Sequence, residues 1–72
     1  MNAFSPMFLK DVLAEVRAIV PKPEIKKAWV WTSDRRTWEF HFGEFYDYFH
    51  ASDAYEAYAK GWEAWLRRRH DA

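Results

Sequence analysis

The fold is decided by one stretch of the chain, which reads AWVWTSDRRTWEFHFGEFYDYF over residues 28–49. Two runs in it, residues 28–32 and 37–42, are rich in the β-branched and aromatic residues that favour strands. A third run, residues 45–49, follows a two-residue turn that starts with Gly43, where hairpins favour glycine. The stretch therefore predicts two hairpins that together form a three-stranded antiparallel sheet.

The register between the strands decides which side chains share a face, because neighbouring residues on a strand point in opposite directions. A four-residue turn between the first two strands would place Trp31 opposite Trp38 and bring an aromatic row under the helices. This row is Trp29, Trp31, Trp38, Phe40, Phe42, Phe45 and Phe49. The open face would hold Ala28, Val30, Thr32, Thr37, Glu39, His41, Tyr46 and Tyr48. Asp47 falls on the apolar side, either as an inward charge that guards a sheet edge or because the register shifts there.

A helix is predicted before the sheet, because apolar residues recur at helical spacing from Leu9 to Val20. Ser5 is the predicted N-cap, and Pro6 suits the first helical position, where its missing N–H costs nothing. The following residues, 21–27, contain two prolines and are predicted to form a connecting loop.

A second helix is predicted after the sheet, with Ser52 as its N-cap. Its apolar stripe consists of Tyr55, Tyr58, Ala59, Trp62, Trp65 and Leu66. Ion pairs at i,i+4 spacing are expected on its polar side, namely Glu56–Lys60 and Glu63–Arg67. Gly61 interrupts this helix at a cost of about 1 kcal/mol, which predicts a close approach to the sheet or to the other helix.

The order α-β-β-β-α predicts a small two-layer α+β domain, in which a three-stranded antiparallel sheet carries two helices on one face. A length of 72 residues indicates a single domain, residues 1–72. This order resembles that of double-stranded-RNA-binding domains, in topology only. The family's last helix starts with lysines, whereas Asp53 and Glu56 stand there in this chain. The resemblance therefore assigns no residue a role.

Composition narrows the function classes. Lys plus Arg number 11, as do Asp plus Glu, so the net charge is zero. A neutral chain is not typical of a general electrostatic nucleic-acid binder. It also has little like-charge repulsion, which favours self-association. The absence of cysteine excludes a disulfide scaffold and any cysteine-based zinc site. We see no apolar run typical of a signal peptide or membrane span, and we expect a cytoplasmic protein without membrane contact.

The residues that carry chemistry do not form a recognisable catalytic or metal-binding pattern. Glu39 and His41 share a strand face, but no further metal ligands accompany them. The run from His50 to Asp53 contains the residue types of a catalytic triad, yet sequence neighbours rarely reach triad geometry. We therefore expect no enzyme, with no catalytic residue, cofactor or metal.

The leading hypothesis starts from fifteen aromatic residues (six Phe, five Trp and four Tyr), more than a core of this size needs. It is a small interaction protein that binds a protein partner through an aromatic, mixed-charge surface. The predicted partner-binding residues are Asp34, Arg35, Arg36, Glu39, His41, Tyr46 and Tyr48. The other interpretation is that Tyr46 and Tyr48 are ordinary exposed strand residues that stabilise cross-strand pairs. This size and composition are typical of phage or mobile-element accessory proteins, including inhibitors of host defence such as anti-CRISPRs.

Two alternatives remain. The first is a nucleic-acid-binding accessory domain, in which basic residues converge beside exposed aromatics. Its residues would be Arg35, Arg36, Arg67, Arg68 and Arg69. The other interpretation is that these arginines are simply solvated and that Arg67, Arg68 and Arg69 interact favourably with the negative end of the helix. The second alternative is a homodimer that the surplus aromatic side chains seal.

Overall fold

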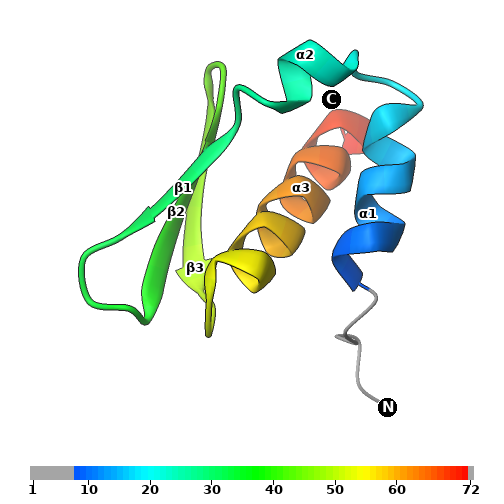
Figure 1. Ribbon diagram of the computed structural model, residues 1–72. Coiled ribbons are helices and arrows are strands. Elements are labelled where there is room, and N and C mark those ends of the chain that lie inside the picture. The colour runs from blue at the N-terminus through cyan, green and yellow to red at the C-terminus, as the bar shows by residue number, and fades with distance from the viewer. Residues whose placement is uncertain (1–7, 72) are drawn as a thin grey trace.

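The predicted sheet is present, with the strand order β1-β2-β3 (Figure 1). In the computed structural model, which describes residues 8–71, the strands are β1 (Trp29–Thr32), β2 (Thr37–Phe42) and β3 (Phe45–His50). The helices are α1 (Phe8–Arg17), α2 (Lys22–Ile25) and α3 (Ala54–Asp71). The α+β class with a three-stranded antiparallel sheet is therefore confirmed. The predicted start of the first helix, Ser5 and Pro6, lies outside the described residues.

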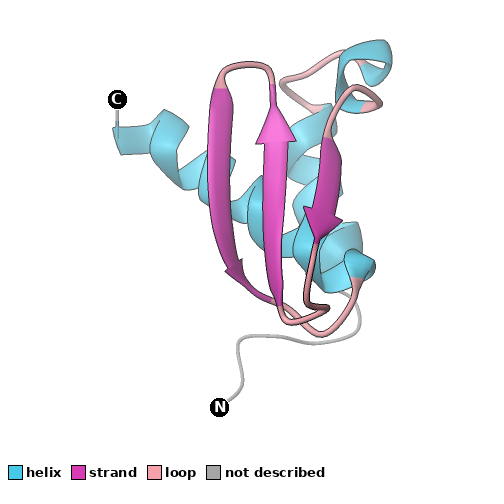
Figure 2. Cartoon of the chain, turned by 90° about the vertical axis from the view of Figure 1, so that its left-hand side faces the viewer, coloured by secondary structure: helices cyan, strands magenta, loops and turns pink. Residues whose placement is uncertain are grey.

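The helices lie on one side of the sheet, and α3 separates the sheet from α1 (Figure 1). The long helix α3 contacts all three strands, while α1 packs against α3. Seen from the sheet side, the strands lie in front and the helices behind them (Figure 2). One face of the sheet is therefore covered by α3, and the described residues leave the other face open.

The segment predicted as a loop, residues 21–27, contains the four-residue helix α2, so that prediction is wrong. Pro21 is its N-cap, and Pro23 lies in its first turn. The first turn is the one part of a helix that tolerates proline, because its N–H groups have no intrahelical acceptor. The two prolines are thus compatible with the start of this short helix.

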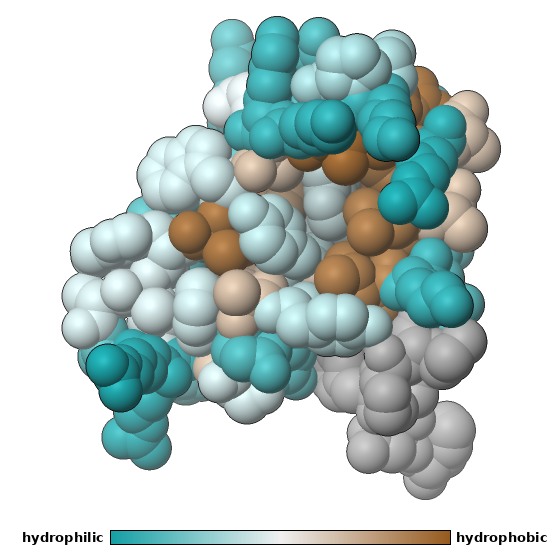
Figure 3. All heavy atoms as spheres, in the orientation of Figure 1, coloured by the Kyte–Doolittle hydropathy of each residue, from teal (hydrophilic) through white to brown (hydrophobic). Residues whose placement is uncertain are grey.

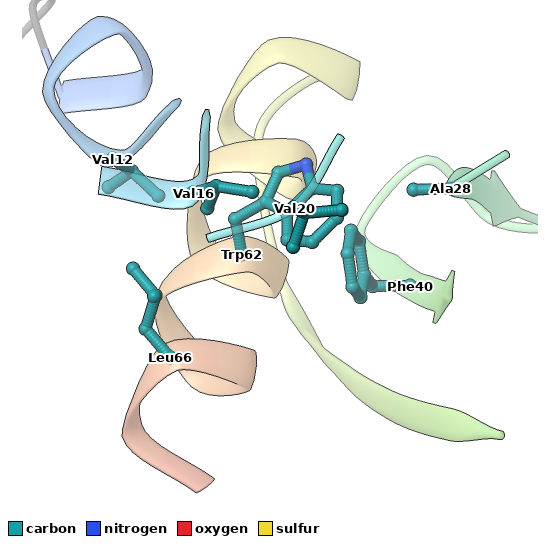
Figure 4. Close-up of a cluster of buried hydrophobic side chains, with 7 residues drawn as sticks. All are labelled: Val12, Val16, Val20, Ala28, Phe40, Trp62 and Leu66. Carbon is teal, nitrogen blue, oxygen red and sulfur yellow. The ribbon is translucent and has the colours of Figure 1, made fainter. Parts of the chain in front are cut away.

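The core is centred on Phe40, which projects from the central strand toward α3 (Figure 4). Its ring meets the Trp62 indole edge to face, with the centroids 5.2 Å apart. Val12 and Val16 reach the same cluster from α1. Aromatic side chains of this size contribute most of the apolar area that a small domain buries, so this cluster joins both helices to the sheet.

Gly61 lies on α3 where that helix crosses Phe40, and the predicted close approach is a helix–sheet contact. A Cβ atom at Gly61 would overlap the Phe40 Cγ and Cδ1 atoms and would lie 2.7 Å from Phe40 Cβ. Any side chain at this position would therefore push the helix away from the sheet.

We predict that Gly61→Ala destabilises the domain by about 2 kcal/mol, because an overpacking cost of about 3 kcal/mol outweighs the gain of about 1 kcal/mol in helix propensity. Urea denaturation measures the change. Adding Phe40→Leu makes room for the methyl group, so the double variant should lose less stability than the sum of the single changes. A Gly61→Ala variant as stable as the wild type would contradict the contact.

The start of α3 is fixed by Asp53, and the predicted cap, Ser52, lies one residue too early. Asp53 Oδ1 accepts the N–H of Glu56 at 2.9 Å, as an N-cap side chain does. Glu56 in turn accepts bonds from the Ser52 N–H and hydroxyl, at 2.7 and 2.8 Å. The i,i+4 pairs predicted on this helix are confirmed, Glu56–Lys60 at 3.6 Å and Glu63–Arg67 at 3.7 Å.

These bonds make the folded state sensitive to acid. The two bonds from Ser52, followed by the charge of Lys60, lower the pKa of Glu56. Ionised Glu56 thus stabilises the fold above its unfolded pKa of about 4.3, and this contribution is lost as the pH falls through the lower folded pKa.

We predict that the melting temperature of the Glu56→Gln variant falls less than that of the wild type when the pH drops below about 4. Glu63→Gln is the matched control and should retain the acid dependence of the wild type.

The pairing of β2 with β3 follows the prediction, with Trp38 opposite Phe49 and Phe42 opposite Phe45. Gly43 has a φ of 60°, which suits the first position of the two-residue turn between them. Asp47 lies opposite Phe40 on the helix side of the edge strand β3. Its inward charge therefore has the edge-guarding position that the sequence allowed.

The pairing of β1 with β2 differs from the prediction by one residue. Trp31 lies opposite Glu39, and Trp38 lies opposite Thr32. The predicted pairing of Trp31 with Trp38 is wrong, and a one-residue shift turns every side chain of a strand to the other face. Trp29 and Trp31 therefore belong to the open face, while Ala28 and Val30, predicted there, pack in or against the core.

The loop between β1 and β2 explains the shift, because five residues, not four, separate Thr32 from Trp38. Asp34 Oδ1 accepts the N–H groups of Arg36 and Thr37, both at 2.8 Å. The Thr32 hydroxyl donates to the Thr37 carbonyl at 2.7 Å, so Thr37 is held by the loop on the β1 side. Arg35 takes a φ of 65°, which lets the longer loop close. The N–H groups also lower the pKa of Asp34.

Candidate protein-binding face

The open side of the sheet carries a contiguous aromatic surface, which we call the open aromatic face. It consists of Trp29, Trp31, Glu39, His41, Tyr46 and Tyr48. The register arranges these side chains in two rows across the three strands. The first row is Trp29–His41–Tyr46, and the second row is Trp31–Glu39–Tyr48.

The side chains of the first row contact one another across the three strands through their rings. The Trp29 and His41 rings are parallel within 6°, with centroids 3.8 Å apart. The Tyr46 ring lies on the other side of His41, at 4.8 Å. Because His41 fills the space between its neighbours, this row presents a continuous surface of ring edges and faces.

The second row has a carboxylate at its centre in place of a ring. Glu39 Oε1 lies 2.8 Å from His41 Nε2, so the carboxylate is directed along β2 toward the first row. Trp31 and Tyr48 are its neighbours on the two flanking strands. The Glu39–His41 contact thus links the rows and limits the rotation of both polar side chains.

Exposure separates this surface from the core. The exposed fractions are 50% for Trp29, 51% for Trp31, 49% for Tyr46 and 62% for Tyr48. Half-exposed aromatic side chains present roughly 100 Å² each, and on the order of 400 Å² in total. The largest apolar patch on a typical monomer covers about 300–600 Å² and is often functional, so this face is the candidate site. The two tyrosines are exposed as predicted, and the two tryptophans, predicted to be buried, join them.

The charges on the face are few. Glu39 is its carboxylate, and the face has no Lys or Arg. Partial burial, followed by repulsion from Glu39, raises the pKa of Tyr46. The Tyr46 hydroxyl therefore keeps its proton and remains a hydrogen-bond donor for a partner.

The hairpin tip, predicted as part of the site, divides into two roles. The Asp34 carboxylate is turned inward to the loop N–H groups, so it maintains the loop. Arg35 and Arg36 line an open cleft with the end of β3 and the start of α3, including His50 and Lys60. These two arginines, which we call the basic rim, therefore lie at the loop end of the sheet, beside α3.

The basic residues of the nucleic-acid alternative do not converge. Arg35 and Arg36 lie beside the start of α3, whereas Arg67, Arg68 and Arg69 lie near its end. The 18 residues of α3 span about 27 Å. The Arg68 and Arg69 guanidinium groups also lie over the Phe45 and Trp65 rings, at 5.5 and 6.0 Å. No single basic surface results from these five residues.

An apolar groove lies where α1, α2 and α3 meet, and Figure 3 shows apolar side chains gathering in this region. Leu9, Leu13, Ile25, Ala28, Tyr58 and Trp62 line it. Ala28 and Trp62 also belong to the buried cluster. The groove is thus the outer margin of the core.

Within residues 8–71, no group of three or more metal-ligating side chains comes together. No helix of this part of the chain combines the length and apolar character needed to cross a membrane. Comparison with protein-family models, curated proteins and solved structures found no match. The functional assignment therefore depends on the chemistry of the surface.

Sequence reasoning missed Trp29 and Trp31 as surface residues. The signal was the Thr-Ser-Asp run at residues 32–34, since Thr and Asp side chains often bond to nearby backbone groups in turns. Such bonding favours a longer loop than the count of polar residues indicates.

We predict that Trp31→Phe removes a large share of the tryptophan emission that acrylamide quenches, because half of Trp31 is exposed. Trp38→Phe, on the helix side of the sheet, should leave the amount of quenchable emission almost unchanged. Steady-state quenching of the two variants measures the difference. Equal losses in both would indicate that Trp31 and Trp38 share a face, against the observed register.

Proposed function

We propose that this chain is a non-enzymatic protein-binding module and that the open aromatic face is its docking surface. The observation that carries the proposal is the pair of aromatic rows, four half-exposed Trp and Tyr side chains on a rigid sheet. Trp and Tyr dominate interface hot spots, because they bury a large area and lose few rotamers.

Charge complementarity specifies the partner. The face has a carboxylate, Glu39, and no Lys or Arg. A partner segment that offers a basic side chain among apolar ones would match both features. A nucleic acid would place phosphate groups against Glu39, which disfavours that alternative.

The position of Glu39 also disfavours a second copy of this chain as the occupant. Glu39 lies on β2, the central strand, with a neighbour on each side. A two-fold axis along β2 would bring two Glu39 carboxylates together, and like charges across an interface are destabilising.

A module of this kind acts by covering a surface of its partner. Such action suits an accessory protein or an inhibitor, the role that size and composition favour, and it needs no catalytic group. The basic rim of Arg35 and Arg36 extends the contact beyond the sheet and suits acidic groups at the margin of the partner.

The test is capture of the partner from host extract, followed by reconstitution with the purified partner. We predict that Tyr46→Ala with Tyr48→Ala weakens binding at least tenfold, because two exposed hot-spot rings are lost. Tyr55→Ala removes an exposed tyrosine from α3 and serves as the control. Calorimetry gives the affinities, and hydrogen exchange maps the protected amides.

The predicted footprint covers β1, β2 and β3, with melting temperatures close to the wild type in both tyrosine variants. Full affinity in the double variant, or protection confined to α1 and α3, would contradict the docking face. A concentration-dependent dimer in sedimentation, abolished by the double variant, would assign the face to self-association.

A further inference from the structure

The second row of the open aromatic face leaves a gap that the first row does not have. In the first row, His41 lies between Trp29 and Tyr46 with ring centroids at 3.8 and 4.8 Å. In the second row, Glu39 occupies the same central position, and its carboxylate turns toward His41.

The flanks of this gap are aromatic. Trp31 and Tyr48 lie on the two strands beside Glu39, and adjacent strands are about 4.8 Å apart, so their backbones are separated by roughly 10 Å. Both side chains are at least half exposed. The His41 ring fills the equivalent position in the first row, so a flat group about as thick as one ring matches the space above Glu39.

The chemistry of the gap selects a cation. A carboxylate forms its floor, and the faces of indole and phenol rings attract positive charge. Guanidinium fits better than ammonium, because it is planar, stacks on aromatic rings, is weakly hydrated and bonds carboxylates through a fork of N–H groups. Glu39 retains Oε2 for such bonds, while Oε1 meets His41.

We propose that the gap between Trp31 and Tyr48 is an arginine site, in which a guanidinium group of a protein partner lies between the two rings and bonds Glu39. This inference rests on the proposed function and names the side chain that the face recognises. His41 acts as a positioning residue, because its contacts with Trp29 and Glu39 hold the carboxylate on the floor of the gap.

The experiment is an NMR titration of the whole chain with two short peptides that differ in one heavy atom, a nitrogen replaced by an oxygen. Acetyl-Ala-Arg-Ala-amide carries the guanidinium, and the citrulline peptide replaces it with a neutral urea of nearly the same shape. We expect the arginine peptide to shift the Trp31 indole N–H and the Glu39 and Tyr48 amides, with an affinity about tenfold above that of the citrulline peptide.

Two substitutions that remove one negative charge each provide the matched control. Glu39→Gln should lose the preference for arginine, whereas Glu44→Gln, in the turn between β2 and β3, should keep it. Equal affinity for both peptides, no shifts with either, or shifts that persist in Glu39→Gln would overturn the arginine site.

Failure of this site is distinguishable from failure of the proposed function. A partner that loses affinity with Tyr46→Ala and Tyr48→Ala, yet binds Glu39→Gln as tightly as the wild type, would overturn the arginine site and leave the docking face. Selective binding of the arginine peptide, with every partner footprint on the helices, would support the site and overturn the docking face.

Discussion

The hydrogen bonds of the loop between β1 and β2 determine which side chains of β1 lie on the open face of the sheet. Asp34 holds two backbone N–H groups, and the Thr32 hydroxyl holds the Thr37 carbonyl. Together they set a five-residue connection and fix how β1 pairs with β2. Because a strand alternates its side chains, this one local arrangement decides whether Trp29 and Trp31 enter the core or face outward.

The core is filled without Trp29 and Trp31 because α3 lies very close to the sheet. Gly61 brings the helix backbone onto Phe40, and Trp62 then meets the Phe40 ring. On the helix side, β1 has Val30 and Thr32, and Ala28 precedes it, all small or medium side chains. A close helix–sheet contact and an aromatic outer face are thus two consequences of one packing arrangement. The same arrangement leaves Glu39 between exposed rings, and on this feature both functional proposals depend.

Local chemistry made most of the fold predictable. Alternation and Gly43 predicted β2, β3 and their pairing, and the break in the helix pattern at Gly61 predicted a close contact. Two of the failures occurred where side chains bond to nearby backbone, and the third where prolines begin a helix. Asp53 replaced Ser52 as the cap, prolines entered the first turn of α2, and Asp34 lengthened the loop by one residue. For the site, Tyr46 and Tyr48 were predictable from β3, but the tryptophans depended on a register that polar residue counts do not determine.

The pairing register of β1 with β2 is tested most directly by the pattern of cross-strand nuclear Overhauser effects between these two strands. The register described above places Trp31 beside Glu39 and Thr32 beside Trp38, so backbone contacts are expected between the members of these pairs. Backbone contacts between Trp31 and Trp38 as direct partners would instead place both indoles under α3. That result would remove the open aromatic face.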